Sequence, residues 1–190
     1  MEEDFFETSL KNRLIIAGIE EISTHGIADF SLRRVAARCE ASCAAPYRHF
    51  KNREEFIREI IAYIHSRFEL LSNKITELYR GDTPRMLVEL CVAYIRFLTA
   101  NANYRAALSA SGEQLGGGGA FLSAPLEAYC REAGIDPASA GRLSYTLHAV
   151  IYGTVSMLEC GELSNDEASF KLIRETIASL LNGTGAPLTI

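Results

Sequence analysis

The side chains with the clearest capacity for chemistry lie in one short basic segment. Between Arg33 and Arg53 there are six arginine or lysine residues and one acid, Glu40, which give this segment a net charge of +5. The whole chain of 190 residues has a net charge of −5, so the remainder has −10. From Tyr47 to Lys51, aromatic rings are interleaved with guanidinium, imidazole and ammonium groups, which donate hydrogen bonds to phosphate oxygens. A basic segment on an acidic protein indicates a local anion-binding surface.

Two short helices are predicted to position this segment. They span residues 31–39 and 42–49, and about three residues connect them, which is the spacing of a helix-turn-helix. Ser31 and Ser42 can cap the two helices, because a serine hydroxyl accepts a hydrogen bond from a backbone N–H of the first turn. The competing interpretation is a solvated basic loop beside a core tyrosine and a core phenylalanine.

The other helices are predicted from apolar periodicity and from residues that start or stop helices. No stretch shows the strict alternation of a strand, so the fold class is predicted to be all-α with about nine helices. The seven further helices are expected at residues 9–25, 53–80, 83–100, 103–111, 120–133, 137–160 and 165–182.

Residues 10–56 resemble the DNA-binding domain of the TetR family of transcriptional regulators. The resemblance rests on Gly26 and on the motifs Ser31-Leu32-Arg33-x-Val35-Ala36, Ser42-x-Ala44-Ala45-Pro46-Tyr47-Arg48-His49-Phe50 and Arg53-Glu54-Glu55-Phe56. The Ala-Pro-Tyr-Arg-His-Phe string of the recognition helix is similar to one branch of that family. The resemblance implies an N-terminal three-helix helix-turn-helix DNA-binding domain over residues 1–52. It also implies a C-terminal helical effector-binding and dimerisation domain over residues 53–190.

The resemblance and the basic charge together select the residues expected to contact DNA. They are Ser31, Arg33, Arg34, Ser42, Cys43, Ala45, Pro46, Tyr47, Arg48, His49, Lys51 and Arg53. By resemblance, Ser42, Cys43 and Ala45 would face the major groove, and Tyr47 and His49 would bind phosphates. Because the recognition helix lacks Asn and Gln, which read base edges, the choice of DNA sequence is expected to depend on phosphate contacts and DNA shape.

The sequence departs from the family pattern at three positions. Glu40 stands at the turn position usually filled by glycine, which costs about 1–2 kcal/mol if its φ is positive. Arg34 replaces the acid usual at that point. Gly18 stands where alanine is usual, which costs about 1 kcal/mol of helix propensity.

Aromatic residues in the C-terminal two-thirds are candidates for an effector pocket. They are Phe68, Tyr94, Phe97, Tyr104, Tyr129, His148 and Tyr152. Few acids lie among them, which favours a mostly apolar or aromatic ligand. The competing interpretation is that the rings belong to the core, and that His148 is a core or interface histidine.

The last two predicted helices have apolar faces that, by resemblance, form a four-helix interface with a second subunit. The residues expected in this interface are Leu143, Leu147, Val150, Ile151, Thr154, Leu158, Phe170, Ile173, Ile177 and Leu180. A two-fold dimer would present two identical DNA-binding domains to a palindrome.

The expected function is therefore that of a sequence-specific DNA-binding transcriptional regulator and not of an enzyme. By resemblance, it is a repressor that a small effector releases from a palindromic operator. The expected partners are double-stranded DNA, a second copy of the chain and that effector. No apolar run approaches the ~18 residues of a membrane span, and the acidic start of the chain is unlike a signal peptide. No membrane partner is expected, and a cytoplasmic location is predicted.

Two other functions compete with this one. The first is a thiol-based redox-sensing regulator, whose thiols would be those of Cys91, Cys130 and Cys160. Small buried hydrophobic residues are the simpler interpretation of these cysteines. The second is a helical interaction module that no longer binds DNA. Cys39, Cys43 and His49 fit no zinc-finger spacing, and no metal or cofactor is predicted.

Overall fold

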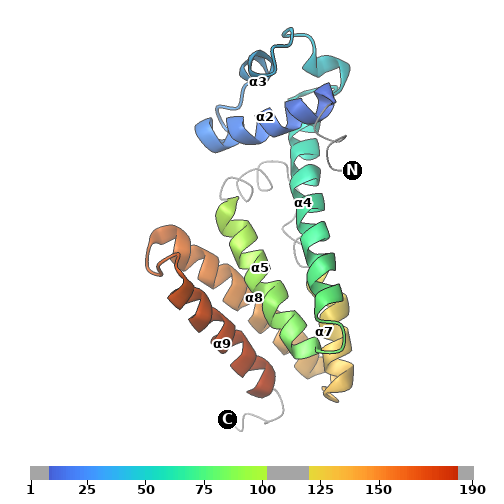
Figure 1. Ribbon diagram of the computed structural model, residues 1–190, viewed down its shortest axis with the longest axis vertical. Coiled ribbons are helices and arrows are strands. Elements are labelled where there is room, and N and C mark those ends of the chain that lie inside the picture. Colours follow the sequence, from blue (N-terminus) through green and yellow to red (C-terminus); the bar gives the residue numbers. More distant parts are fainter. Residues whose placement is uncertain (1–8, 102–119, 184–190) are drawn as a thin grey trace. The chain divides into compact units, whose positions relative to one another are not determined.

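The computed structural model describes residues 9–101 and 120–183, and these residues form helices and connecting turns without a strand (Figure 1). The elements are α2 Leu10–His25, α3 Leu32–Arg38, η1 Pro46–Arg48, α4 Arg53–Leu78, α5 Thr83–Ala100, α7 Ala120–Glu132, α8 Pro137–Cys160 and α9 Glu167–Gly183. The all-α class is confirmed for the described part of the chain. Against the expected count of about nine helices, the described residues contain seven α-helices and one 3-10 helix.

The predicted helix over residues 42–49 accounts for part of this difference. Only Pro46–Arg48 is helical, as one 3-10 turn. The backbone hydrogen bonds here span three residues: the Ala45 N–H lies 2.9 Å from the Ser42 carbonyl oxygen, and the Arg48 N–H 3.1 Å from that of Ala45. An α-helix would need an N–H at Pro46 to bond the Ser42 carbonyl, and proline has none. The predicted helix over residues 103–111 lies outside the described residues.

The chain divides into two compact units. The described residues of the first unit are 9–67, and those of the second are 68–101 and 120–183. The boundary between Arg67 and Phe68 falls within α4, so this helix contributes residues to both units. This division is geometric, and the functional division between residues 52 and 53 stays a prediction.

The core of the first unit is built from α2, α3 and the first half of α4. Phe56 lies at its centre, with its ring centroid 5.7 Å from that of Phe30 and 4.3 Å from that of Phe50, which it meets edge-on. The start of α4 is fixed by a capping arrangement. The Asn52 side chain accepts a hydrogen bond from the Glu55 N–H at 2.8 Å, and the Glu55 carboxylate accepts one from the Lys51 N–H at 2.6 Å.

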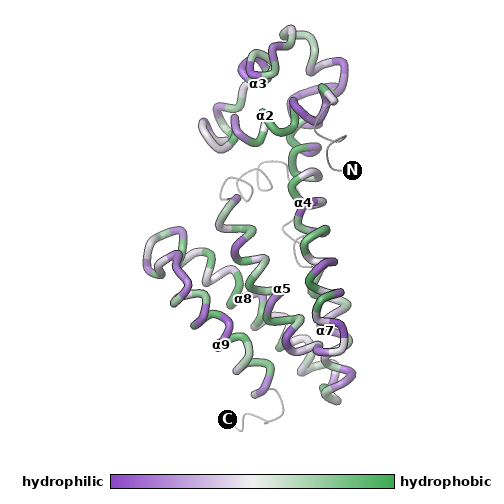
Figure 2. Tube along the Cα trace, in the orientation of Figure 1, coloured by the Kyte–Doolittle hydropathy of each residue, from purple (hydrophilic) through white to green (hydrophobic). Residues whose placement is uncertain are grey.

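The second unit is arranged around α5, which packs against α7, α8 and α9. Hydrophobic positions recur along these helices in the manner of elements with one buried face (Figure 2). Two charged contacts join α5 to α9. Arg174 Nε lies 3.1 Å from Glu89 Oε1, and Arg96 Nη2 lies 2.6 Å from Glu167 Oε1, with the Arg96 guanidinium 3.8 Å from the centroid of the Phe170 ring. No helix in the described residues is long and apolar enough to cross a membrane.

Candidate nucleic-acid interface and ligand-binding residues

The turn after α3 sets the direction in which the chain leaves that helix and enters the second half of the basic segment. Glu40 has a φ of +54°, as the glycine usually found at this position would allow. The Ala41 N–H bonds the Ala36 carbonyl at 3.0 Å, and the Glu40 N–H bonds the Ala37 carbonyl at 3.1 Å. This is a Schellman motif, in which the residue after the helix C-cap is left-handed. The strain expected at Glu40 is therefore present.

Eight of the twelve residues expected to contact DNA are exposed on the first unit. One of them is Arg34, whose side chain is 42% exposed but forms an ion pair with Glu21. The other seven are Arg33, Ser42, Cys43, Tyr47, Arg48, His49 and Lys51. The Tyr47 side chain is 59% exposed although it is aromatic. Ser31 is the N-cap of α3, and its hydroxyl accepts a hydrogen bond from the Arg34 N–H at 3.5 Å. Together with Ser31, the exposed side chains place hydroxyl, phenol, guanidinium, imidazole and ammonium donors on α3, on the turn before η1, on η1 and on the residues directly after it.

Ala45 and Pro46 lie in a different environment, because both side chains are buried in the first unit. Their methyl and ring carbons pack against the protein interior. Ala44, one residue earlier, is exposed. The small exposed side chains available to a groove are therefore those of Ser42, Cys43 and Ala44.

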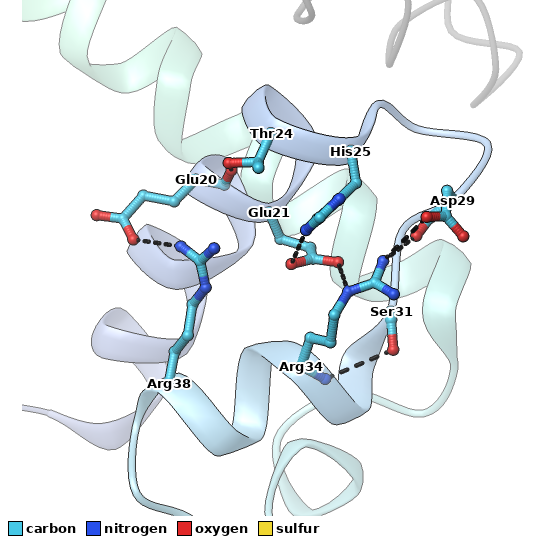
Figure 3. Close-up of polar contacts among 8 residues, drawn as sticks. All are labelled: Glu20, Glu21, Thr24, His25, Asp29, Ser31, Arg34 and Arg38. Carbon is cyan, nitrogen blue, oxygen red and sulfur yellow. Dashed lines mark hydrogen bonds and ion pairs between the residues drawn. The ribbon is translucent and has the colours of Figure 1, made fainter.

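Arg34 and Arg53 are held by the protein itself. Arg34 Nε donates to Glu21 Oε1 at 2.5 Å, and Arg34 Nη2 donates to the Asp29 carbonyl (Figure 3). Arg53 Nη2 donates to the Ile27 carbonyl at 2.5 Å. Sequence reasoning missed Glu21 as a structural partner. The available signal was an acid on the apolar face of the 9–25 helix, since a buried carboxylate requires a cation.

Three of the predicted effector residues meet in one aromatic cluster of the second unit. The Phe68 ring centroid lies 5.0 Å from that of Tyr94 and 4.8 Å from that of Phe97. Phe121, which was not selected from the sequence, completes the cluster at 4.9 Å from Phe68 and 4.6 Å from Tyr94. The four rings come from α4, α5 and α7. Tyr94 and Phe68 are buried, whereas Phe97 and Phe121 are partly exposed.

The other predicted effector residues have separate roles. The Tyr129 hydroxyl donates to the Leu181 carbonyl at 2.5 Å and so joins α7 to α9. His148 Nδ1 lies 2.7 Å from the Ser144 carbonyl oxygen, and the His148 ring stacks on Tyr152 with centroids 6.5 Å apart. Tyr104 lies outside the described residues.

The residues expected at a dimer interface divide into two groups. Six of them are buried within the single chain, where α8 and α9 pack against α5: Leu143, Leu147, Ile151, Phe170, Ile173 and Ile177. Val150, Thr154, Leu158 and Leu180 are partly exposed. The large apolar side chains most exposed on α8 and α9 are instead Tyr145 at 76%, Leu172 at 56% and Met157 at 42%. Apolar periodicity identifies a buried face, but it does not say whether the same chain or a second one covers it.

Three of the five cysteines lie in surroundings that keep their thiols protonated. Burial raises the pKa of Cys91 to about 12, and burial also raises the pKa of Cys39 and of Cys130. Cys43 and Cys160 are exposed. Among the residues that the structure describes, no group of three or more His, Cys, Asp or Glu side chains is placed to hold a metal ion.

Comparison with known proteins agrees with the helix-turn-helix geometry. Residues 14–60 match the family described as bacterial regulatory proteins, tetR family. No curated protein sequence matches the chain. Among solved structures, a protein of unknown function from Rhodococcus sp. RHA1 is 19% identical with a TM-score of 0.76, and the match covers 92% of this chain and 95% of that one.

Two further structures are described with ligands. The transcriptional regulator FadR from Bacillus subtilis, in complex with stearoyl-CoA, is 15% identical with a TM-score of 0.67, over 90% of this chain and 97% of that one. A TetR variant from Acinetobacter baumannii AYE, in complex with minocycline, is 16% identical with a TM-score of 0.59, over 90% and 94%. At these identities the likeness shows a shared fold. Residues 14–60 of the chain thus match the tetR family, and the fold of the chain is shared with solved TetR-type regulators.

Proposed function

We propose that the protein is a TetR-type transcriptional regulator that binds DNA through its first unit. The observation that carries this proposal is the group of exposed donors on α3, η1 and the intervening turn, within a domain that matches the tetR family. Arg33, Arg48 and Lys51 supply positive charge, and Tyr47 and His49 supply further hydrogen-bond donors. Such donors bind phosphates and fix the orientation of a protein on a duplex.

The choice of DNA sequence would depend on a close backbone approach and on DNA shape. The exposed residues Ser42, Cys43 and Ala44, which lie between the Glu40 turn and η1, are small, so the backbone there can come close to base edges. Ala44, exposed where Ala45 and Pro46 are not, is the side chain best placed to contact a thymine methyl group. Ala45 and Pro46, which the sequence analysis placed among the DNA contacts, are buried, so Ala44 is proposed for this contact in their place.

The regulator would act as a homodimer through α8 and α9. The supporting observation is that Tyr145 and Met157 on α8 and Leu172 on α9 are exposed, together with the small exposed residues Ala149 and Gly153 on α8. Small residues let helices from two subunits approach closely, and large apolar ones give the association its free energy. On DNA, the two recognition elements would lie about 34–36 Å apart, or a further helical turn.

A small apolar or aromatic effector would bind near the cluster of Phe68, Tyr94, Phe97 and Phe121. Its four rings offer stacking surface, and the two structural neighbours described with ligands hold minocycline and stearoyl-CoA. An effector that prefers the state unable to bind DNA would lower DNA affinity by linkage, which is repression released by the ligand. Because α4 contributes residues to both units, it is the proposed route of this coupling.

Selection of bound fragments from a random pool of double-stranded DNA, at near-physiological salt, tests the proposal. A palindromic consensus is the expected result. Salt-sensitive binding without a consensus would leave only phosphate contacts and would remove the claim of sequence specificity. Absence of binding at every salt concentration would overturn the proposal and favour a helical interaction module.

A further inference from the structure

A buried carboxylate joins α2 to α3 in the first unit. The Glu21 side chain is 0% exposed and lies on the same face of α2 as the buried residues Leu14, Gly18 and Ile22. Its Oε1 accepts a hydrogen bond from Arg34 Nε at 2.5 Å. Within the described residues its Oε2 has no hydrogen-bond partner. A carboxylate at this depth is tolerated only when a cation compensates its lost hydration.

Arg34 makes a second contact that fixes its direction. Its Nη2 donates to the carbonyl of Asp29, in the loop between α2 and α3, and lies 3.5 Å from Asp29 Oδ2. Figure 3 shows the guanidinium between Glu21 and Asp29, with His25 next to the second oxygen of the Glu21 carboxylate. His25 Nε2 lies 3.8 Å from Glu21 Oε2. The guanidinium is thus held at two edges by groups of the same unit.

The basic residues of α3 divide into two sets. Arg34 and Arg38 are one helical turn apart, and both reach α2, where Arg38 Nη1 lies 2.9 Å from Glu20 Oε2. Arg33 is exposed and has no ion-pair partner among the described residues. Residues four apart lie on the same side of a helix, whereas adjacent residues do not. The side of α3 that bears Arg34 and Arg38 is occupied by α2, and Arg33 projects from another side.

From these contacts we infer that Arg34 is a positioning residue for DNA binding and not a phosphate contact. With Glu21 it fixes the register of α3 on α2, and so the direction of Arg33 and of the turn that leads to Arg48 and His49. The inference rests on the proposed DNA-binding function. α3 has seven residues, of which only Val35 and Ala36 are buried, so apolar packing alone offers little to prevent sliding. The Glu21 carboxylate is fully buried and the Arg34 side chain is 42% exposed, so a shift of α3 along α2 would leave the buried charge without its cation.

A double-mutant cycle between Arg34→Met and Glu21→Leu separates the two roles. The affinity is measured at 25 °C for the fragment recovered by the wild-type chain, over a range of salt concentrations, with circular dichroism to verify that each variant is folded. Arg34→Met in the wild-type background is expected to weaken binding about tenfold or more, because Glu21 is left buried without its cation. In the Glu21→Leu background, Arg34→Met is expected to change the DNA affinity less than about threefold. The salt dependence should stay that of the wild type in both backgrounds.

Three results would overturn the inference. If Arg34→Met weakens binding by the same factor in both backgrounds and reduces the slope of log K against log salt by about 0.9 for each subunit bound, Arg34 is a phosphate contact. If the folded Arg34→Met variant binds as tightly as wild type, the pair affects stability only. If the wild-type chain shows no salt-sensitive DNA binding, the proposed function fails as well, which distinguishes that outcome from the other two.

The Glu21→Leu variant and the double variant keep the test informative if Arg34→Met does not fold. The double variant needs no buried charge, so comparing it with Glu21→Leu alone still measures the loss of Arg34. A positioning role predicts near-equal affinities for these two proteins, and a phosphate contact predicts weaker binding by the double variant. Arg33→Met is the matched control on the same helix, and it should weaken binding and lower the salt slope in both backgrounds.

Discussion

Gly18 on α2 lies directly against Phe56 on α4. A Cβ built at Gly18 would stand 2.6 Å from Phe56 Cε1 and 2.6 Å from Ile60 Cδ1, closer than non-bonded carbon atoms approach. The glycine therefore has a packing role, although it is unfavourable for the helix itself. Because Gly18 has no side chain, α2 can lie close to the first turns of α4. These turns carry Phe56, which is fully buried at the centre of the first unit.

Replacing Gly18 by alanine is expected to destabilise the first unit. The added methyl group must displace the Phe56 ring and the Ile60 side chain, and overpacking of this kind costs about 1–3 kcal/mol, more than the helix propensity gained. Denaturant unfolding measures the change. Gly141→Ala on α8 is the matched control, because a Cβ there meets nothing within 4 Å. It should be neutral or stabilising by up to about 1 kcal/mol, and a stabilised Gly18→Ala variant would contradict the packing role.

Glu40→Gly is expected to stabilise the chain and to tighten DNA binding. Glycine relieves a backbone strain of about 1–2 kcal/mol at the φ of +54°, and the change removes an acid beside the basic segment. Thermal unfolding reports the first effect, and DNA affinity at low salt reports the second. Glu40→Gln separates the two, since it removes the charge but keeps the strain. A Glu40→Gly variant no more stable than Glu40→Gln would show that the turn is not strained.

Met157→Glu is expected to convert a dimer into a monomer with little loss of monomer stability. The side chain is 42% exposed on the proposed dimer surface, so a carboxylate is hydrated in the monomer and desolvated in the dimer. Sedimentation equilibrium measures the association. Leu78→Glu on α4, which is 73% exposed and outside that surface, is the control and should not change it. Equal association of wild type and Met157→Glu would place the interface elsewhere.

Alkylation of the folded chain is expected to modify Cys43 and Cys160 but not Cys91. Burial raises the pKa of Cys91 to about 12, so its reactive thiolate is absent at neutral pH and the site is closed to reagent. Between about pH 9 and pH 12 the unfolded chain loses this proton and the folded chain keeps it, so the buried thiol lowers stability as pH rises. Mass spectrometry locates the label. Bound DNA should protect Cys43 and leave Cys160 reactive, whereas rapid labelling of Cys91 would support a thiol sensor.

The sequence predicted those elements whose local signals agree with each other. The helices over residues 120–133, 137–160 and 165–182 were found within two residues of α7, α8 and α9, because capping residues and apolar periodicity indicate the same bounds. The predicted helix over 42–49 failed at Pro46, where one missing N–H outweighed the helical preference of the neighbouring alanines.

The site was predicted less completely, because charge and apolar spacing do not identify partners. Arg34 and Arg53 were counted as DNA contacts from the family resemblance and their charge, yet Glu21 and the Ile27 carbonyl bind them within the unit. Phe121 was omitted because its neighbours in space, Phe68 and Tyr94, are distant in sequence. Such pairings arise from tertiary packing, which no local pattern encodes.

The salt dependence of DNA affinity is the most direct test of DNA binding through α3, η1 and the turn between them. The wild-type chain and Arg48→Gln are compared on the selected fragment, with Arg80→Gln, an exposed arginine of the second unit, as the control. Affinity should fall steeply with salt. Arg48→Gln should reduce the slope by about one unit for each subunit bound, and Arg80→Gln should leave it unchanged. Affinity independent of salt, or equal slopes for wild type and Arg48→Gln, would contradict DNA binding through this surface.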